Sequence, residues 1–101
     1  MILAQVVGTV VSTVAVEVLA GQTLLMVRPV NPDGTPTGKA RIALDRVGAG
    51  VGDRVLVIDE GNAGRQITGI ADAPIKTLVV GFVDSVELGG EVVFDYRELE
   101  A

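Results

Sequence analysis

Short runs of valine, leucine and isoleucine, interrupted every few residues by glycine or proline, follow one another along this chain. β-Branched side chains fit the pleated surface of a strand, and the spacing of the turn residues is that of an all-β barrel or sandwich. The connections leave little room for a helix longer than two or three turns. With 101 residues the chain can bury one core, so we expect a single domain over residues 1–101.

Five or six strands are predicted from these runs. The first begins at Ile2 and extends to about Val18, because its even positions are nearly all apolar or small. Two prolines and two glycines over 31–38 predict an exposed hairpin connection. The further predicted strands are Gln22–Val30, Lys39–Leu44, Arg54–Asp59, Thr77–Leu88 and, after a turn at Gly89 and Gly90, Glu91–Tyr96. This length suits a small, five- to six-stranded closed barrel of the oligonucleotide/oligosaccharide-binding (OB) type with a C-terminal hairpin strand.

Several strands are apolar on both faces. Leu24, Leu25, Met26 and Val27 follow one another in the second run, and the run from Val55 to Ile58 has the same character. No amphipathic helix is available to cover a second apolar face. We therefore infer that another copy of the chain covers it, in an obligate oligomer. The alternative is a monomer with small exposed valine patches.

The residue types that are missing from the sequence exclude several kinds of functional site. The chain contains no cysteine and no histidine, which removes disulfides, imidazole bases and the usual zinc ligands. The acidic residues stand singly in turns or at strand ends, so we expect no enzyme, no metal and no cofactor. A net charge of −5 with scattered basic residues argues against nucleic acid as a partner. No apolar run reaches the roughly 20 residues that span a bilayer, and Met1 to Val7 does not resemble a signal peptide, so we expect a cytoplasmic protein without membrane contact.

Two glycine-containing segments and one carboxylate stand out. The spacing in Gly48-Ala49-Gly50-Val51-Gly52 is not that of a dinucleotide-binding loop, so we interpret its glycines as positions of positive φ and close approach by a neighbouring chain. Gly61-Asn62-Ala63-Gly64-Arg65 is either a plain turn or a loop that binds an anion through backbone N–H groups. Asp84 interrupts an apolar strand face, so its carboxylate must be paired, or that face must open to water.

Taken together, the chain resembles the vertex proteins of carboxysomes and metabolosomes, the EutN/CcmL family. The resemblance covers roughly residues 2–88, and its stretches occur in the family's order. They are Gly8-Thr9-Val10-Val11-Ser12-Thr13, Leu24-Leu25-Met26-Val27, Val47-Gly48-Ala49-Gly50-Val51-Gly52-Asp53 before Val55-Leu56-Val57, Ala63-Gly64-Arg65, and Val79-Val80-Gly81-Phe82-Val83-Asp84-Ser85-Val86.

The resemblance implies a five-stranded barrel, a homopentamer, and a place at the vertices of a bacterial microcompartment shell among hexameric or trimeric shell proteins. It places a pore loop at Gly61, Asn62, Ala63, Gly64 and Arg65, and subunit contacts at Gly48, Ala49, Gly50 and Val51. Within that arrangement we expect Arg65 to pair with Asp84 near the subunit interface. The family loop usually has serine and alanine before the arginine, where this chain has Ala63 and Gly64. The alternative function is that of a small ligand- or oligonucleotide-binding barrel.

Overall fold

A computed structural model of the chain describes residues 1–11, 23–59 and 77–100. In these residues it contains seven strands and one 3₁₀ helix. The strands are β1 (Ile2–Val10), β2 (Leu24–Pro29), β3 (Arg41–Asp45), β4 (Arg54–Asp59), β5 (Thr77–Phe82), β6 (Ser85–Leu88) and β7 (Glu91–Asp95), and the helix is η2 (Tyr96–Glu100). Among the described residues, no helix is long and apolar enough to cross a membrane.

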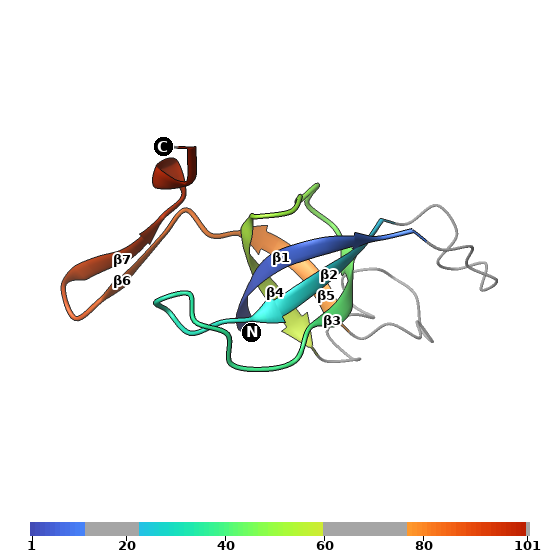
Figure 1. Ribbon diagram of the computed structural model, residues 1–101, viewed down its shortest axis with the longest axis horizontal. Coiled ribbons are helices and arrows are strands. Elements are labelled where there is room, and N and C mark those ends of the chain that lie inside the picture. The colour runs from blue at the N-terminus through green and yellow to red at the C-terminus, as the bar shows by residue number, and fades with distance from the viewer. Residues whose placement is uncertain (12–22, 60–76, 101) are drawn as a thin grey trace.

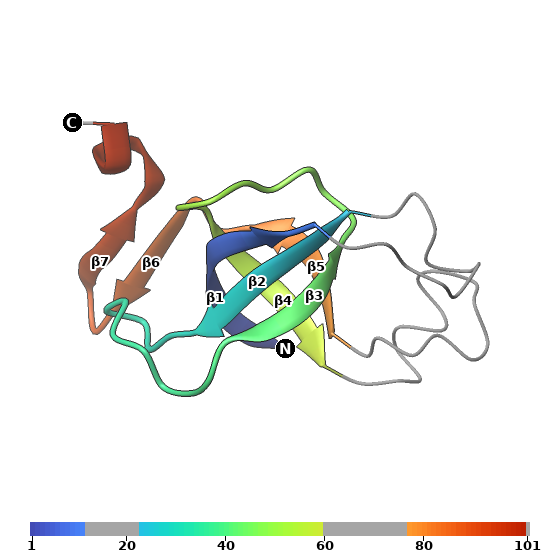
Figure 2. The same cartoon turned by 45° about the vertical axis from the view of Figure 1, so that its right-hand side comes forward.

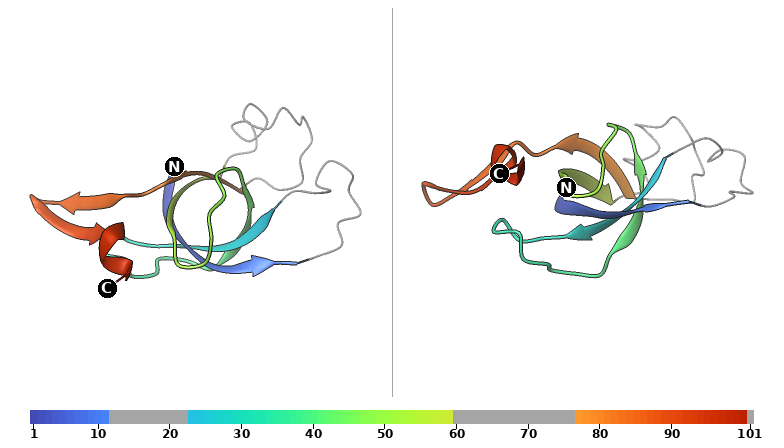
Figure 3. Two further views of the ribbon diagram at one scale, coloured as in Figure 1. Left: turned by 90° about the horizontal axis from the view of Figure 1, so that it is seen from above. Right: turned by 45° about the horizontal axis from the view of Figure 1, so that its top comes forward.

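Five of the strands form a closed barrel in the order β1-β2-β3-β5-β4 (Figures 1 and 3). Neighbouring strands are antiparallel except for β3 and β5, which are parallel. Closure leaves the barrel without a free edge that could pair with another sheet. The predicted fold, an all-β barrel of five to six strands followed by a C-terminal hairpin, is confirmed.

The barrel interior is filled by aliphatic side chains, most of them alanine or valine. They come from alternate positions of the strands, as the two-residue period requires. This inner cluster consists of Ala4, Val6, Leu25, Val27, Ala43, Val55, Val57 and Val79, all at most 1% exposed. Of the apolar or small even positions of β1, Ala4 and Val6 point into the barrel, whereas the strand register shifts between Val6 and Gly8, so that Gly8 pairs with Met26 on the outer face.

A second apolar cluster lies on the outer face of the same strands. Leu24, Leu44 and Leu78 pair in register across β2, β3 and β5, and each is at most 8% exposed in the single chain. Each leucine is adjacent in sequence to a residue of the inner cluster, so it points the opposite way. Our inference that another copy must cover the second face is therefore wrong at this cluster, because the chain itself buries it.

The predicted strand Thr77–Leu88 is two strands, β5 and β6, separated by Val83 and Asp84. The Val83 N–H still donates to the Arg54 carbonyl of β4 at 2.9 Å, whereas the Asp84 carbonyl accepts from the Tyr96 N–H at 2.9 Å. The chain thus leaves the barrel at this point and pairs with β7 instead. An apolar run cannot indicate that a strand changes its partner, which is why the break was not predicted.

The β6–β7 hairpin projects from the barrel and lengthens the molecule to 45 Å (Figures 1 and 2). The predicted turn at Gly89 and Gly90 is confirmed, with φ of 62° and 84°, values that favour glycine at both positions. The exposed 31–38 connection is also confirmed, and it leaves the barrel at the same end as the hairpin (Figure 2). The expected first strand ends at Val10, and its remaining positions from 12 to 18 lie outside the described residues.

Candidate assembly surface

The glycine-rich segment between β3 and β4 closes one end of the barrel (Figure 3). Val47 and Ala49 are half-buried and pack against the inner cluster, so this part of the segment belongs to the core. Gly48 is exposed, Gly50 is half-buried, and the Val51 side chain is 65% exposed. Of the residues expected at a subunit interface, Val51 therefore offers the largest apolar surface to another molecule.

Hydrogen bonds from backbone N–H groups to two carboxylates fix the shape of this segment. The Asp45 carboxylate accepts from the N–H of Gly48 at 3.1 Å, and the Asp53 carboxylate accepts from the N–H of Gly50 at 2.8 Å. Gly48 and Gly52 have φ of 79° and 95°, and a Cβ at either position would meet nothing within 4 Å. Backbone conformation, not space within the chain, therefore requires glycine at these two positions.

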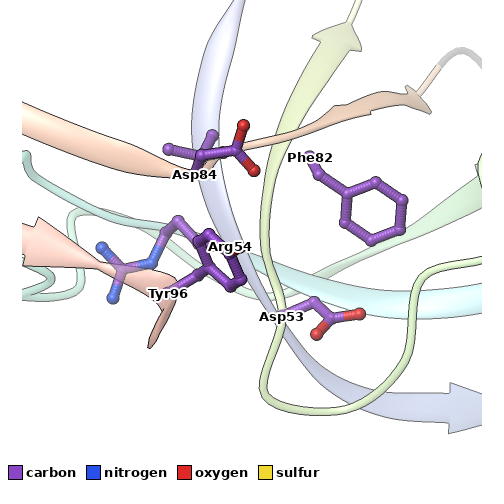
Figure 4. Close-up of a pocket in the computed structure, with 6 residues that line it drawn as sticks. Asp53, Arg54, Phe82, Asp84 and Tyr96 are labelled. Carbon is purple, nitrogen blue, oxygen red and sulfur yellow. The ribbon is translucent and has the colours of Figure 1, made fainter. Parts of the chain in front are cut away.

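A pocket of about 360 Å³ lies where the hairpin leaves the barrel, and we call it the junction pocket (Figure 4). Its lining residues are Asp53, Arg54, Phe82, Val83, Asp84 and Tyr96. Phe82 and Tyr96 are about half exposed, and Asp84 is exposed. Of the two arrangements expected around Asp84, the structure adopts the one in which the strand face opens to water.

Arg54 connects the barrel to the hairpin. Its guanidinium carbon lies 4.3 Å from the centroid of the Phe94 ring, and Phe94 is buried. A Cβ on Gly34 would lie 3.0 Å from Nη2 of Arg54, so the small residue in the 31–38 turn leaves room for the cation. Figure 4 shows the guanidinium directed away from the carboxylates of Asp53 and Asp84. A cation–π contact of this kind contributes about 0.5–2 kcal/mol.

The cation–π contact leaves two of the three guanidinium nitrogens without an acceptor. Nε and Nη1 of Arg54 are buried and have no hydrogen-bond partner. Burial lowers the pKa of the Arg54 guanidinium, because the charged form loses contact with water. A buried donor without an acceptor costs about 1–3 kcal/mol, and more when it is charged. At the contact between hairpin and barrel, the cation–π interaction is therefore stabilising and the burial of the two unpaired donors is destabilising.

A wider groove of about 540 Å³ runs between the outer face of the barrel and the hairpin, and we call it the junction groove. Its floor is apolar, because Leu3 and Leu56 pair in register and Leu56 pairs in turn with Gly81 of β5. Its charged residues, Asp84 and Glu87, are both acidic and exposed. The complete lining is Leu3, Leu56, Phe82, Val83, Asp84, Ser85, Val86 and Glu87.

A second apolar row crosses the outer face of β1, β2 and β3. Gly8 pairs with Met26 and Met26 pairs with Ile42, and we call this row the Met26–Ile42 face. Ile42 is 44% exposed, and Val7 beside the row is 40% exposed. Arg28 lies two residues beyond Met26 on the same strand face and is exposed. An apolar surface with a basic residue at its edge therefore faces solvent here.

The end of the hairpin carries an ion pair. Nη2 of Arg97 lies 2.6 Å from Oδ2 of Asp95, and Nε donates to Oδ1 at 3.0 Å. The hydrogen bonds from Arg97 lower the pKa of Asp95 to about 2. The pair is bidentate, but the Arg97 side chain is 75% exposed, so the pair orders the start of η2 more than it stabilises the fold.

Comparison with known proteins decides the family. Residues 1–84 match the family described as ethanolamine utilisation protein EutN/carboxysome. This chain belongs to the EutN/CcmL family. Over 92 residues, 91% of this chain and 96% of the relative, it is 42% identical to the bacterial microcompartment shell vertex protein EutN of Escherichia coli K12. Over 96 residues, 95% of each chain, it is 39% identical to the carboxysome shell vertex protein CcmL of Synechocystis.

A solved structure in the EutN/CcmL family has a similar fold. The GrpN pentameric microcompartment shell protein from Rhodospirillum rubrum superposes with a TM-score of 0.75 at 38% sequence identity. The match covers 87% of this chain and 99% of that one.

For this EutN/CcmL family member the predicted site residues fall into three groups. The expected pore loop Gly61–Arg65, and with it the expected pair of Arg65 and Asp84, lies outside the described residues. The expected interface segment Gly48–Val51 lies at the end of the barrel. Asp84 lines the junction pocket together with Asp53, which lies two residues after that segment.

Sequence reasoning did not single out Arg54, Phe94 or the Met26–Ile42 face. Arg54 and Phe94 lie 40 positions apart, and no local pattern indicates that a cation will lie over that ring. Met26 and Ile42 were visible only as members of apolar runs. Only the pairing register of β2 and β3 shows that the two residues lie side by side. The described residues hold no group of three or more acidic side chains arranged to bind a metal ion.

Proposed function

We propose that this chain, through one domain spanning residues 1–101, assembles into homopentamers that occupy the vertices of a bacterial microcompartment shell. A flat sheet of hexagonal tiles closes only where pentagons are inserted, so the function is curvature and closure. The observation that carries the proposal is similarity over 86–95% of the chain to shell vertex proteins of several microcompartments. The pentameric state of the R. rubrum relative supports the number of copies.

The described surface supports a structural part in an assembly. The chain keeps two separate apolar surfaces in water, the junction groove and the Met26–Ile42 face. We propose that the function is structural and not catalytic, because a chain without histidine and cysteine has no imidazole base and no thiolate nucleophile, and its relatives are shell vertex proteins.

Within this proposal the protein lies in the cytoplasm as part of the shell. Its partners are four further copies of itself and the hexameric or trimeric tiles that surround a vertex. Gly61 to Arg65 line the central opening, and Gly48 to Val51 lie at subunit contacts.

Native mass spectrometry of the purified chain tests the assembly. We expect a species of five copies of the 10.4 kDa chain. A monomer at micromolar concentration would contradict the proposal.

Deleting the gene in the source bacterium tests the function, and unclosed or elongated shells are the expected result. Closed shells of normal size would show that vertices are sealed without this protein.

A further inference from the structure

We propose that neighbouring copies join head to tail, with the Met26–Ile42 face of one copy seated in the junction groove of the next. In this contact Arg28 of the first copy lies beside Asp84 and Glu87 of the second. The inference rests on the proposed function, since it supplies the contact that would hold a ring of five together. The site is incomplete in one chain, because the groove receives its cover only from another copy.

The two surfaces are centred on different flanks of the barrel, and β1 contributes Leu3 to the groove and Gly8 to the face. Leu56 of β4 forms the middle of the groove floor, whereas Met26 and Ile42 belong to β2 and β3. In the barrel order β1-β2-β3-β5-β4, β1 separates β4 from β2, and β5 separates β4 from β3 (Figure 3). A molecule with two different complementary surfaces on separate flanks joins its copies head to tail, which closes into a ring when the rotation allows. A self-complementary dimer would need a single surface that meets itself.

The shapes and polarities of the two surfaces are suited to each other. The groove floor is made by Leu3 and Leu56, and Gly81 beside them presents no side chain. The opposing face projects Ile42, which is 44% exposed, next to Val7 at 40%. Apolar area on both sides leaves water when they meet, and this is the main favourable term in association.

Charge favours the same pairing. The whole chain carries −5, so two copies placed at random repel each other. The charged residues that line the groove are Asp84 and Glu87, and the exposed charged residue on the strand face beside Met26 is Arg28. Bringing these together offsets the general repulsion and fixes the orientation of the contact. Seating a second groove against the groove would instead oppose like charges.

Cysteine crosslinking tests the orientation directly, because the chain has no cysteine of its own. One variant carries Ile42→Cys and another carries Glu87→Cys, and each is treated with a short bis-maleimide crosslinker after expression alone or together. We expect covalent dimers only when the two variants are co-expressed. Dimers from Ile42→Cys alone would indicate a self-complementary contact and overturn the inference. The inference is also wrong if the co-expressed variants do not crosslink while native mass spectrometry still finds five copies. In that case the proposed function stands.

A second pair of variants tests the contribution of the face to assembly. Ile42→Asp places a carboxylate on the Met26–Ile42 face, and we expect the pentamer to be lost while the thermal unfolding of the chain remains cooperative. Val92→Asp is the matched control, because Val92 is 58% exposed on the hairpin and lines neither the groove nor the face. We expect it to remain pentameric. If Ile42→Asp remains pentameric, the inference is wrong. A wild-type chain that is monomeric in the same buffer would contradict the proposed function itself.

Discussion

Replacing Arg54 tests the energetic balance of the contact between hairpin and barrel. Arg54→Met keeps a long unbranched side chain over Phe94 but removes the charge and the buried donors Nε and Nη1. The cation–π term that is lost is about 0.5–2 kcal/mol, and a thioether against the ring returns about 0.3–1.5 kcal/mol. The desolvation cost that is relieved is about 1–3 kcal/mol. We therefore expect the free energy of unfolding of Arg54→Met to lie within about 1 kcal/mol of the wild-type value or above it.

Arg54→Ala provides the contrast. It removes the donors as well, but it also leaves the Phe94 ring without cover where Gly34 has no side chain to fill the space. Full truncation of a buried methionine or leucine costs about 2–5 kcal/mol, and Arg54 is only partly buried, so we expect a loss of about 1–2 kcal/mol. For a chain of this length, 1 kcal/mol shifts the midpoint of thermal unfolding by about 4–8 °C.

Thermal unfolding followed by circular dichroism measures the difference between the two variants. All variants are compared at one protein concentration, because the stability of an oligomer depends on concentration. Arg46→Met is the matched control, since it removes an exposed cation just beyond β3 and is expected to change little. If Arg54→Met is destabilised as much as Arg54→Ala, the guanidinium makes hydrogen bonds in solution that its buried nitrogens lack here, and the reasoning is refuted.

Three further predictions concern the loop, the hairpin and the outer cluster. Gly52→Ala is expected to lower the free energy of unfolding by about 1–2 kcal/mol in chemical denaturation, because φ is 95° there; an unchanged value would contradict the strain argument. Asp95, with its pKa lowered to about 2 from 3.8, stabilises the fold above pH 4 and loses that contribution as the pH falls from about 4 to 2. A carboxyl NMR titration should show this midpoint in the wild type and a higher one in Arg97→Gln. In urea, Leu44→Ala should lower the free energy of unfolding by about 2–5 kcal/mol. Leu88→Ala, at a residue that is 57% exposed, should change it by less than about 0.5 kcal/mol. Equal losses would refute the burial of the outer cluster within one chain.

The sequence alone determined the local elements of this protein. β4 has the predicted bounds, Arg54–Asp59, and the turn at Gly89 and Gly90 lies where it was expected. Alternation of apolar residues and turn chemistry are local properties, and they act over a few residues wherever the chain is placed. The order of the motifs along the sequence also indicated the family.

Tertiary structure decided which residues meet and what covers each apolar face. An alternating pattern predicts that Leu24 and Leu25 face opposite ways, but it does not predict that Leu44 and Leu78 pack with Leu24 inside one chain. The break at Val83 and Asp84 and the position of Arg54 over Phe94 depend on pairing between residues far apart in the sequence. Such pairing depends on register and barrel closure, which are properties of the whole sheet and not of any single run.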